Sequence, residues 1–118
     1  MVNISVLVSG GGTNLQALID KVESGELAGA EIVQVISSRE GVFALERAAK
    51  AGIKGKVIKD TEGLLEALAE ENTDLVVLAG YMKVLEPPVI DAYRGRIINI
   101  HPSLIPKYCG KGFYGKRV

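Results

Sequence analysis

Apolar and polar residues follow two different periods along the chain, which predicts strands and helices in turn. Continuous apolar runs rich in β-branched residues occur at 3–8, 30–36 and 74–79. Such runs are typical of strands that are buried on both faces of a sheet. Shorter runs at 55–58 and 97–99 bring the predicted strands to five.

The segments between these strands carry apolar residues at helical spacing. Helices are predicted over residues 15–24, 42–51, 61–72 and 87–93. We expect Thr61 to cap the third helix, with Leu64, Leu65 and Leu68 as its buried stripe. Prolines at the start of the fourth helix suit its first turn.

Strands that alternate with helices predict a parallel sheet with right-handed crossovers. We therefore expect one α/β domain over residues 1–118, with a Rossmann-like open parallel sheet in a three-layer α/β/α arrangement. Polar clusters at 9–14, 80–85 and 99–103 follow three of the strands. If the strand order is 3-2-1-4-5, these clusters share the carboxyl edge of the sheet, where such folds bind ligands.

Composition narrows the class of protein. The 118 residues are 47% hydrophobic, which is enough for a core. No apolar run approaches the ~20 residues of a membrane span, and the N-terminus has no basic segment before an apolar one, so we expect a cytoplasmic protein without a membrane partner. The single cysteine, Cys109, excludes an internal disulfide and a cysteine-based metal cluster.

Charge is balanced overall but unevenly distributed. After Asp91 the sequence has six basic residues and no acidic one. A basic end is one feature of nucleic-acid binding. The simpler interpretation is that acidic partners lie further along a longer protein, so we expect no nucleic-acid partner.

The segment Ser9-Gly10-Gly11-Gly12-Thr13-Asn14 breaks the first strand and opens a helix. Glycines let the backbone approach a ligand, and a helix N-terminus offers N–H groups to an anion, so a phosphate group is the expected ligand. No lysine follows at the spacing of a Walker A motif, and Leu15 stands where a dinucleotide fingerprint needs its third glycine. Arg39, after the second strand, keeps NADP binding open as an alternative.

Two further clusters carry candidate chemistry. Exposed backbone beside the apolar residues of 79–85 suits a flat heteroaromatic ring, although core packing explains the same residues. Asn99 and His101 stand two apart in a strand and so point to one face. An amide and an imidazole side by side can stabilise charge on a carbonyl oxygen and donate a proton.

Taken together, the segments 4–17, 74–85 and 99–108 resemble the folate-dependent formyltransferases, most closely the glycinamide ribonucleotide formyltransferases of purine biosynthesis. The run Asn-Ile-His-Pro-Ser-Leu-Ile-Pro at 99–106 is specific to that superfamily. The run Ser-Gly-Gly-Gly-Thr-Asn-Leu at 9–15 narrows the resemblance to the glycinamide ribonucleotide formyltransferases within it. Methionyl-tRNA formyltransferases share the former without needing this loop. Formyltetrahydrofolate deformylases typically carry a second histidine where this sequence has Pro102.

The resemblance implies that glycinamide ribonucleotide is formylated by 10-formyltetrahydrofolate, the folate co-substrate, without a metal. It assigns the ribonucleotide phosphate to three loop residues: Gly12, Thr13 and Asn14. It assigns the pterin pocket to Met82, Lys83, Val84 and Leu85. Asn99 then orients the formyl oxygen, as both a catalytic and a folate-binding residue, and His101 stabilises the tetrahedral intermediate.

The family also has a catalytic aspartate beyond the last motif, which the 118 residues do not reach. We therefore expect the N-terminal portion of such an enzyme, with impaired turnover by itself. A non-catalytic phosphate- or nucleotide-binding module is the alternative. An uncovered sheet surface would also favour a homodimer.

Overall fold

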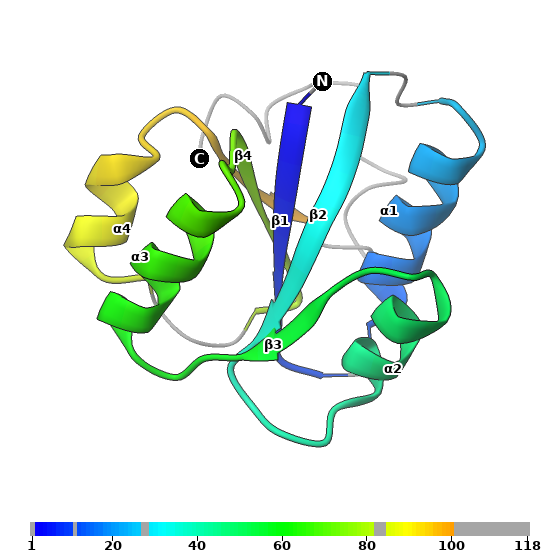
Figure 1. Cartoon of the computed structure of the whole chain (residues 1–118), viewed down its shortest axis with the longest axis horizontal. Coiled ribbons are helices and arrows are strands. Elements are labelled where there is room, and N and C mark those ends of the chain that lie inside the picture. Colours follow the sequence, from blue (N-terminus) through cyan, green and yellow to red (C-terminus); the bar gives the residue numbers. More distant parts are fainter. Residues whose placement is uncertain (1, 11, 27–28, 82–84, 101–118) are drawn as a thin grey trace.

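The computed structural model describes residues 2–10, 12–26, 29–81 and 85–100 and shows a central sheet with helices on both sides (Figure 1). Its strands are β1 (Val2–Val8), β2 (Ala30–Ser37), β3 (Gly55–Val57), β4 (Leu75–Ala79) and β5 (Ile97–Ile100). Its helices are α1 (Thr13–Glu23), α2 (Phe43–Lys50), α3 (Thr61–Glu70) and α4 (Pro87–Ala92). No helix in the described part of the chain is long and apolar enough to cross a membrane.

The five strands are parallel, which confirms the predicted fold, and they lie in the order β3-β2-β1-β4-β5, the order under which the predicted polar clusters share one edge. From β1 the chain builds outward through β2 to β3. It then crosses back so that β4 pairs with the other side of β1. The direction of winding therefore reverses between β1 and β4, the position where sheets of this type bind ligands.

Helices α1 and α2 cover one face of the sheet, and α3 and α4 cover the other (Figure 1). The core under α1 and α2 contains Ile4, Val6 and Val8 of β1, and the core under α3 and α4 contains Leu7. This alternation along β1 follows from the two-residue period of a strand. Both faces are apolar because both are covered.

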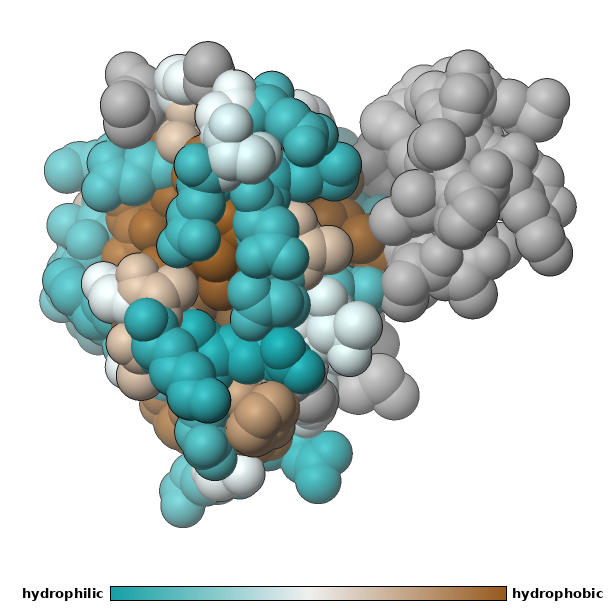
Figure 2. Space-filling model, turned by 90° about the vertical axis from the view of Figure 1, so that its right-hand side faces the viewer, coloured by the Kyte–Doolittle hydropathy of each residue, from teal (hydrophilic) through white to brown (hydrophobic). Residues whose placement is uncertain are grey.

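The face under α1 and α2 has an apolar hollow of about 240 Å³ between the two helices. Figure 2 shows apolar surface between polar side chains on this side of the molecule. The hollow lies beside Glu31 and Ile32 at the start of β2, away from the carboxyl edge. It is therefore separate from the polar clusters that the sequence predicts as the site.

A polar cross-link fixes α3 to the sheet. The Gln34 Nε2 atom donates to Ser5 Oγ at 2.9 Å and to the Ala67 carbonyl of α3 at 3.0 Å. Ser5 Oγ also lies 2.7 Å from Thr73 Oγ1. Because these side chains are buried, the bonds hold α3 in a defined position, and its N-terminus then borders the pocket described below.

The predicted N-cap of α3 is wrong by one residue. Asp60 is the N-cap: its side chain accepts a hydrogen bond from the Gly63 N–H at 2.9 Å, and Thr61 is the first helical residue. Asp and Thr both cap helices, so the adjacent pair gave an ambiguous signal.

Two details of α3 also differ from the prediction. Leu65 is only partly buried, whereas Ala67 is buried together with Leu64 and Leu68. The helix ends at Glu70 instead of reaching Asn72, because Asn72 adopts a positive φ of 52° and the Thr73 N–H donates to the Leu68 carbonyl. A right-handed helix that ends in a residue of left-handed backbone conformation shows these features.

Candidate functional site

The glycine loop joins β1 to α1 and approaches α2 closely. Gly12 is the N-cap of α1 with φ 85°, in the left-handed region that favours glycine. A Cβ atom at this position would lie 2.7 Å from Ala44 Cα. The Ala44 N–H also donates to the Gly10 carbonyl at 3.2 Å, so the loop is tied to the N-terminal end of α2.

The start of α1 presents backbone N–H groups suited to an anion. Its first intrahelical bond runs from the Gln16 N–H to the Gly12 carbonyl at 2.8 Å. The N–H groups of Thr13 and Asn14 come before that bond and so have no partner within the helix. The N-cap residue, Gly12, makes no side-chain hydrogen bond to them. The positive end of the helix dipole adds to their attraction for negative charge.

Two arginines place positive charge beside this loop. The Arg39 Nη1 atom donates to the Ser9 carbonyl at 3.4 Å, so the exposed guanidinium lies at the end of β1. The Arg47 Nη1 atom donates to Gln16 Oε1 at 3.2 Å, and its guanidinium lies 4.8 Å from the Phe43 ring centroid. Both cations raise the local positive potential that an incoming phosphate would meet.

Asn14 connects the loop to the last described strand. Its half-buried side chain donates from Nδ2 to the Ile100 carbonyl at 3.3 Å. Ile100 is the last residue of β5, and the residue before it is the candidate Asn99. The glycine loop and the end of β5 are thus held together, as the shared carboxyl edge predicts.

Asn99 lies on the face of the sheet that α3 and α4 cover. It is half-buried and stands opposite Leu78 in the β4–β5 register. Ile97, two residues earlier, packs in the core under α3 and α4, whereas Ile100 packs under α1 and α2. The two-residue period of β5 therefore places Asn99 on the same face as Ile97.

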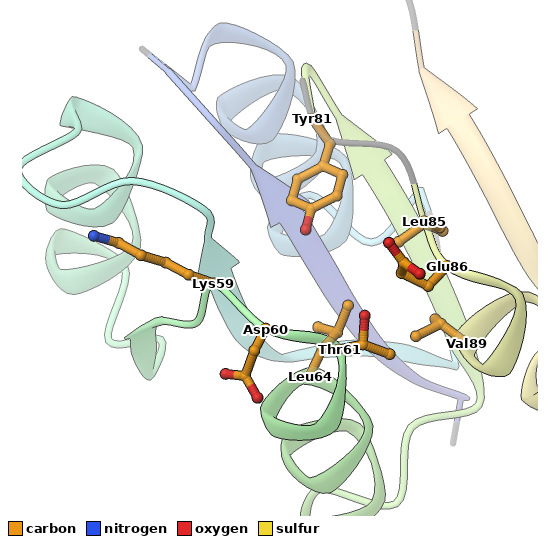
Figure 3. Close-up of a pocket in the computed structure, with 8 residues that line it drawn as sticks. All are labelled: Lys59, Asp60, Thr61, Leu64, Tyr81, Leu85, Glu86 and Val89. Carbon is orange, nitrogen blue, oxygen red and sulfur yellow. The ribbon is translucent and has the colours of Figure 1, made fainter.

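A pocket of about 270 Å³ opens on this same face, between the start of α3 and the start of α4 (Figure 3). Leu85, predicted as a cofactor-binding residue, is part of its wall, and the Tyr81 ring points into it. Burial raises the pKa of the Tyr81 hydroxyl above its ordinary value of 10.0. The complete lining is Lys59, Asp60, Thr61, Leu64, Tyr81, Leu85, Glu86 and Val89.

Sequence reasoning did not single out Tyr81 or Val89 as site residues. Tyr81 stands within the predicted cluster 80–85, directly before the residues that the resemblance assigns to the pterin pocket. Val89 belongs to α4 whereas Leu85 precedes that helix, so their spacing in the sequence gives no signal of a shared wall. The contribution of Thr61 and Leu64 depends on how α3 packs, for which the sequence has no local signature.

The other predicted site residues lie outside the described part of the chain: Met82, Lys83, Val84 and His101. Five predicted site residues are described: Gly12 is the N-cap of α1, Thr13 and Asn14 begin that helix, Leu85 precedes α4, and Asn99 lies in β5. Within residues 2–10, 12–26, 29–81 and 85–100, no three His, Cys, Asp or Glu side chains gather in a way that could hold a metal ion.

The sequence matches a family model described as "Formyl transferase" over residues 2–116. Phosphoribosylglycinamide formyltransferase of Escherichia coli is 42% identical over 118 residues, which is 92% of this chain and 55% of the enzyme. The trifunctional purine biosynthetic protein adenosine-3 of Drosophila pseudoobscura pseudoobscura is 48% identical over 118 residues, which is 91% of this chain and 9% of that protein.

Solved structures give the same result. The crystal structure of glycinamide ribonucleotide transformylase 1 from Symbiobacterium toebii superimposes with a TM-score of 0.81 at 39% identity, covering 92% of this chain and 55% of that one. The chain therefore spans about half the length of such bacterial relatives and under a tenth of the insect protein.

Proposed function

The chain belongs to the formyl transferase family, and on that premise we propose that it serves the transfer of a formyl group from 10-formyltetrahydrofolate to the amine of glycinamide ribonucleotide. One observation carries the proposal: the hydrogen bond from Asn14 to the Ile100 carbonyl joins the glycine loop to the strand that bears Asn99. An anion site and a polarising amide are thereby held at one edge of the sheet, as a reaction between a phosphorylated amine and a carbonyl compound requires.

In this proposal the ribonucleotide phosphate binds at the start of α1. The N–H groups of Thr13 and Asn14 donate to it, and Gly12 allows the backbone to come close. Arg39 and Arg47, whose guanidinium groups donate to the Ser9 carbonyl and to Gln16 beside the loop, strengthen the attraction for the phosphate. The phosphate anchors the substrate and leaves its amine free to reach the formyl carbon.

The folate is assigned to the face that α3 and α4 cover. The pocket offers an aromatic ring at Tyr81 and an apolar wall at Leu85 and Val89, and a flat pterin ring can pack against both. Asn99 stands on that face of β5. We assign Met82, Lys83 and Val84 to the same ring, because they link Tyr81 to Leu85 in sequence.

The chemistry then follows from the residue types. The substrate amine forms a bond to the formyl carbon, and negative charge develops on the formyl oxygen. Asn99 donates to that oxygen, and His101 stabilises the tetrahedral intermediate. The bond from the formyl carbon to N10 of the folate breaks, N10 gains a proton and the amine nitrogen loses one. No metal takes part in these steps.

The test is a turnover assay of the complete protein that carries this chain, with 10-formyltetrahydrofolate and three acceptors: glycinamide ribonucleotide, methionyl-tRNA and water. We expect formyl transfer to glycinamide ribonucleotide, and a fall of about 10²- to 10³-fold in kcat for Asn99→Leu, the loss typical of one oxyanion donor. Transfer to methionyl-tRNA or water instead would assign a different folate enzyme. Binding of the ribonucleotide without any transfer would support a non-catalytic phosphate-binding module and refute the proposed activity.

We also propose a cytoplasmic location and a homodimer. In the described sheet β5 is an edge strand, and all four of its residues are partly exposed. An edge of this kind supports pairing with a second copy.

A further inference from the structure

The side chain of Asn14 has a different environment from its backbone. Its backbone N–H belongs to the first turn of α1, whereas its Nδ2 atom lies 3.3 Å from the Ile100 carbonyl of β5. The two residues are 86 positions apart in the sequence. The amide therefore forms a long-range link between the helix that opens the glycine loop and the strand that bears Asn99.

Two other strand ends meet at this point. A Cβ atom at Gly80, the residue after β4, would lie 4.0 Å from Asn14 Nδ2. The loop that precedes Asn14 begins at the end of β1. The amide thus lies where β1, β4 and β5 all end, at the reversal of winding in the sheet.

The end of β5 depends on such a link more than the interior strands do. β5 pairs only with β4 among the described strands, and its residues are partly exposed. A strand held on one side opens more readily than one held on both. A hydrogen bond to its last carbonyl restrains the end at which Asn99 must be oriented.

We propose that the Asn14 side chain is a positioning residue that fixes the end of β5 relative to the glycine loop, and that Asn14 contributes to phosphate binding through its backbone N–H alone. This inference rests on the proposed function, because it takes the loop as the ribonucleotide site and Asn99 as the group to be oriented. The side chain then links two parts of the site and makes no contact with the phosphate.

The chain contains a matched control for this role. The Asn3 Nδ2 atom donates to the Asn72 carbonyl at 3.0 Å, at the opposite, amino-terminal edge of the sheet. It is also an asparagine side chain bonded to a distant backbone carbonyl. Asn3→Ala removes this bond and a longer one from Nδ2 to the Glu71 carbonyl at 3.5 Å, both far from the site, and it reports the general effect of losing such bonds.

The experiment measures two quantities on this chain: amide hydrogen exchange by NMR and the affinity for glycinamide ribonucleotide by calorimetry. In Asn14→Ala we expect exchange at Asn99 and Ile100 to accelerate about tenfold, the factor for losing one hydrogen bond, with the Kd unchanged within about threefold. In Asn3→Ala the exchange of these two amides stays as in the wild type. Asn14→Gln, which keeps the donor, restores part of the protection.

The positioning role is overturned if exchange at Asn99 and Ile100 changes no more in Asn14→Ala than in Asn3→Ala. It is equally overturned if Asn14→Ala weakens ribonucleotide binding by about tenfold or more, the result expected of a direct phosphate ligand. Failure of the wild-type chain to bind the ribonucleotide counts against the proposed function instead, and the exchange comparison then decides the link by itself.

Discussion

Gly12→Ala is the substitution whose effect the structure determines most directly. Gly12 combines φ 85° with the close approach of α2: the added Cβ would lie 2.7 Å from Ala44 Cα and 2.8 Å from Ala44 Cβ. Ala44 is fully buried, and its Cα is part of the helix backbone. No flexible side chain can move aside to relieve this contact, so either the loop or α2 must shift.

The expected cost has two parts. An L-residue in the left-handed region costs about 1–2 kcal/mol. Overpacking against a fixed neighbour costs about 1–3 kcal/mol more. The free energy of unfolding should therefore fall by about 2–5 kcal/mol, and the loop should move away from the position that presents its N–H groups.

Gly41→Ala separates the two parts. Gly41 also has a positive φ, 68°, but nothing lies within 4 Å of a Cβ atom built on it. Its substitution should carry the conformational cost alone, about 1–2 kcal/mol, and should leave ribonucleotide binding unchanged.

Urea unfolding of both variants and the wild type measures these differences, provided that the slope of the unfolding curve stays constant. Equal destabilisation by Gly12→Ala and Gly41→Ala would show that the contact with Ala44 has no energetic consequence. The close approach of α2 would then not be the reason for a glycine at position 12.

Three further predictions concern other parts of the molecule. Asp60→Ala should lower the free energy of unfolding by about 1 kcal/mol in a urea titration, because it removes the hydrogen bond that the Asp60 side chain accepts from the Gly63 N–H. Thr61→Ala should lower it by under about half of that amount. A larger effect of Thr61→Ala would show that Thr61 is the cap. The hydrogen bond from Lys54 lowers the pKa of Glu71 below its ordinary value of 4.5, so the destabilisation caused by Lys54→Met should be present at neutral pH and disappear as the pH falls through the lowered pKa. A pH-independent difference would contradict that coupling. Sedimentation should show dimers of the chain as concentration rises, and a monomer at every concentration would refute pairing through the β5 edge of the sheet.

Periodicity alone predicted the strands and the helices, because the runs that form β1, β2 and β4 are apolar enough to require cover on both faces. The strand order does not follow from periodicity and was only a condition for the shared edge. Periodicity could not choose between Asp60 and Thr61 as the cap, since both residue types fill that position and they are adjacent. The glycine-rich motif after β1 and the family resemblance, not periodicity, identified Gly12 as a site residue, and its contact with Ala44 depends on how α2 packs.

The partner of Asn14 could not be predicted for a different reason. The acceptor is a backbone carbonyl, which has no side-chain signature, and it lies 86 residues away in the sequence. The pocket was predicted only at Leu85, because its remaining wall forms when α3 and α4 pack side by side. Contacts between distant elements are thus the part of the site that required a structure.

The central claim is that the glycine loop binds the ribonucleotide phosphate, and calorimetric titration of the chain with glycinamide ribonucleotide tests it most directly. We predict saturable binding that inorganic phosphate displaces, that Gly12→Ala weakens by about tenfold or more, and that Gly41→Ala leaves intact. The absence of binding to a folded chain, or equal binding by the two variants, would contradict the claim.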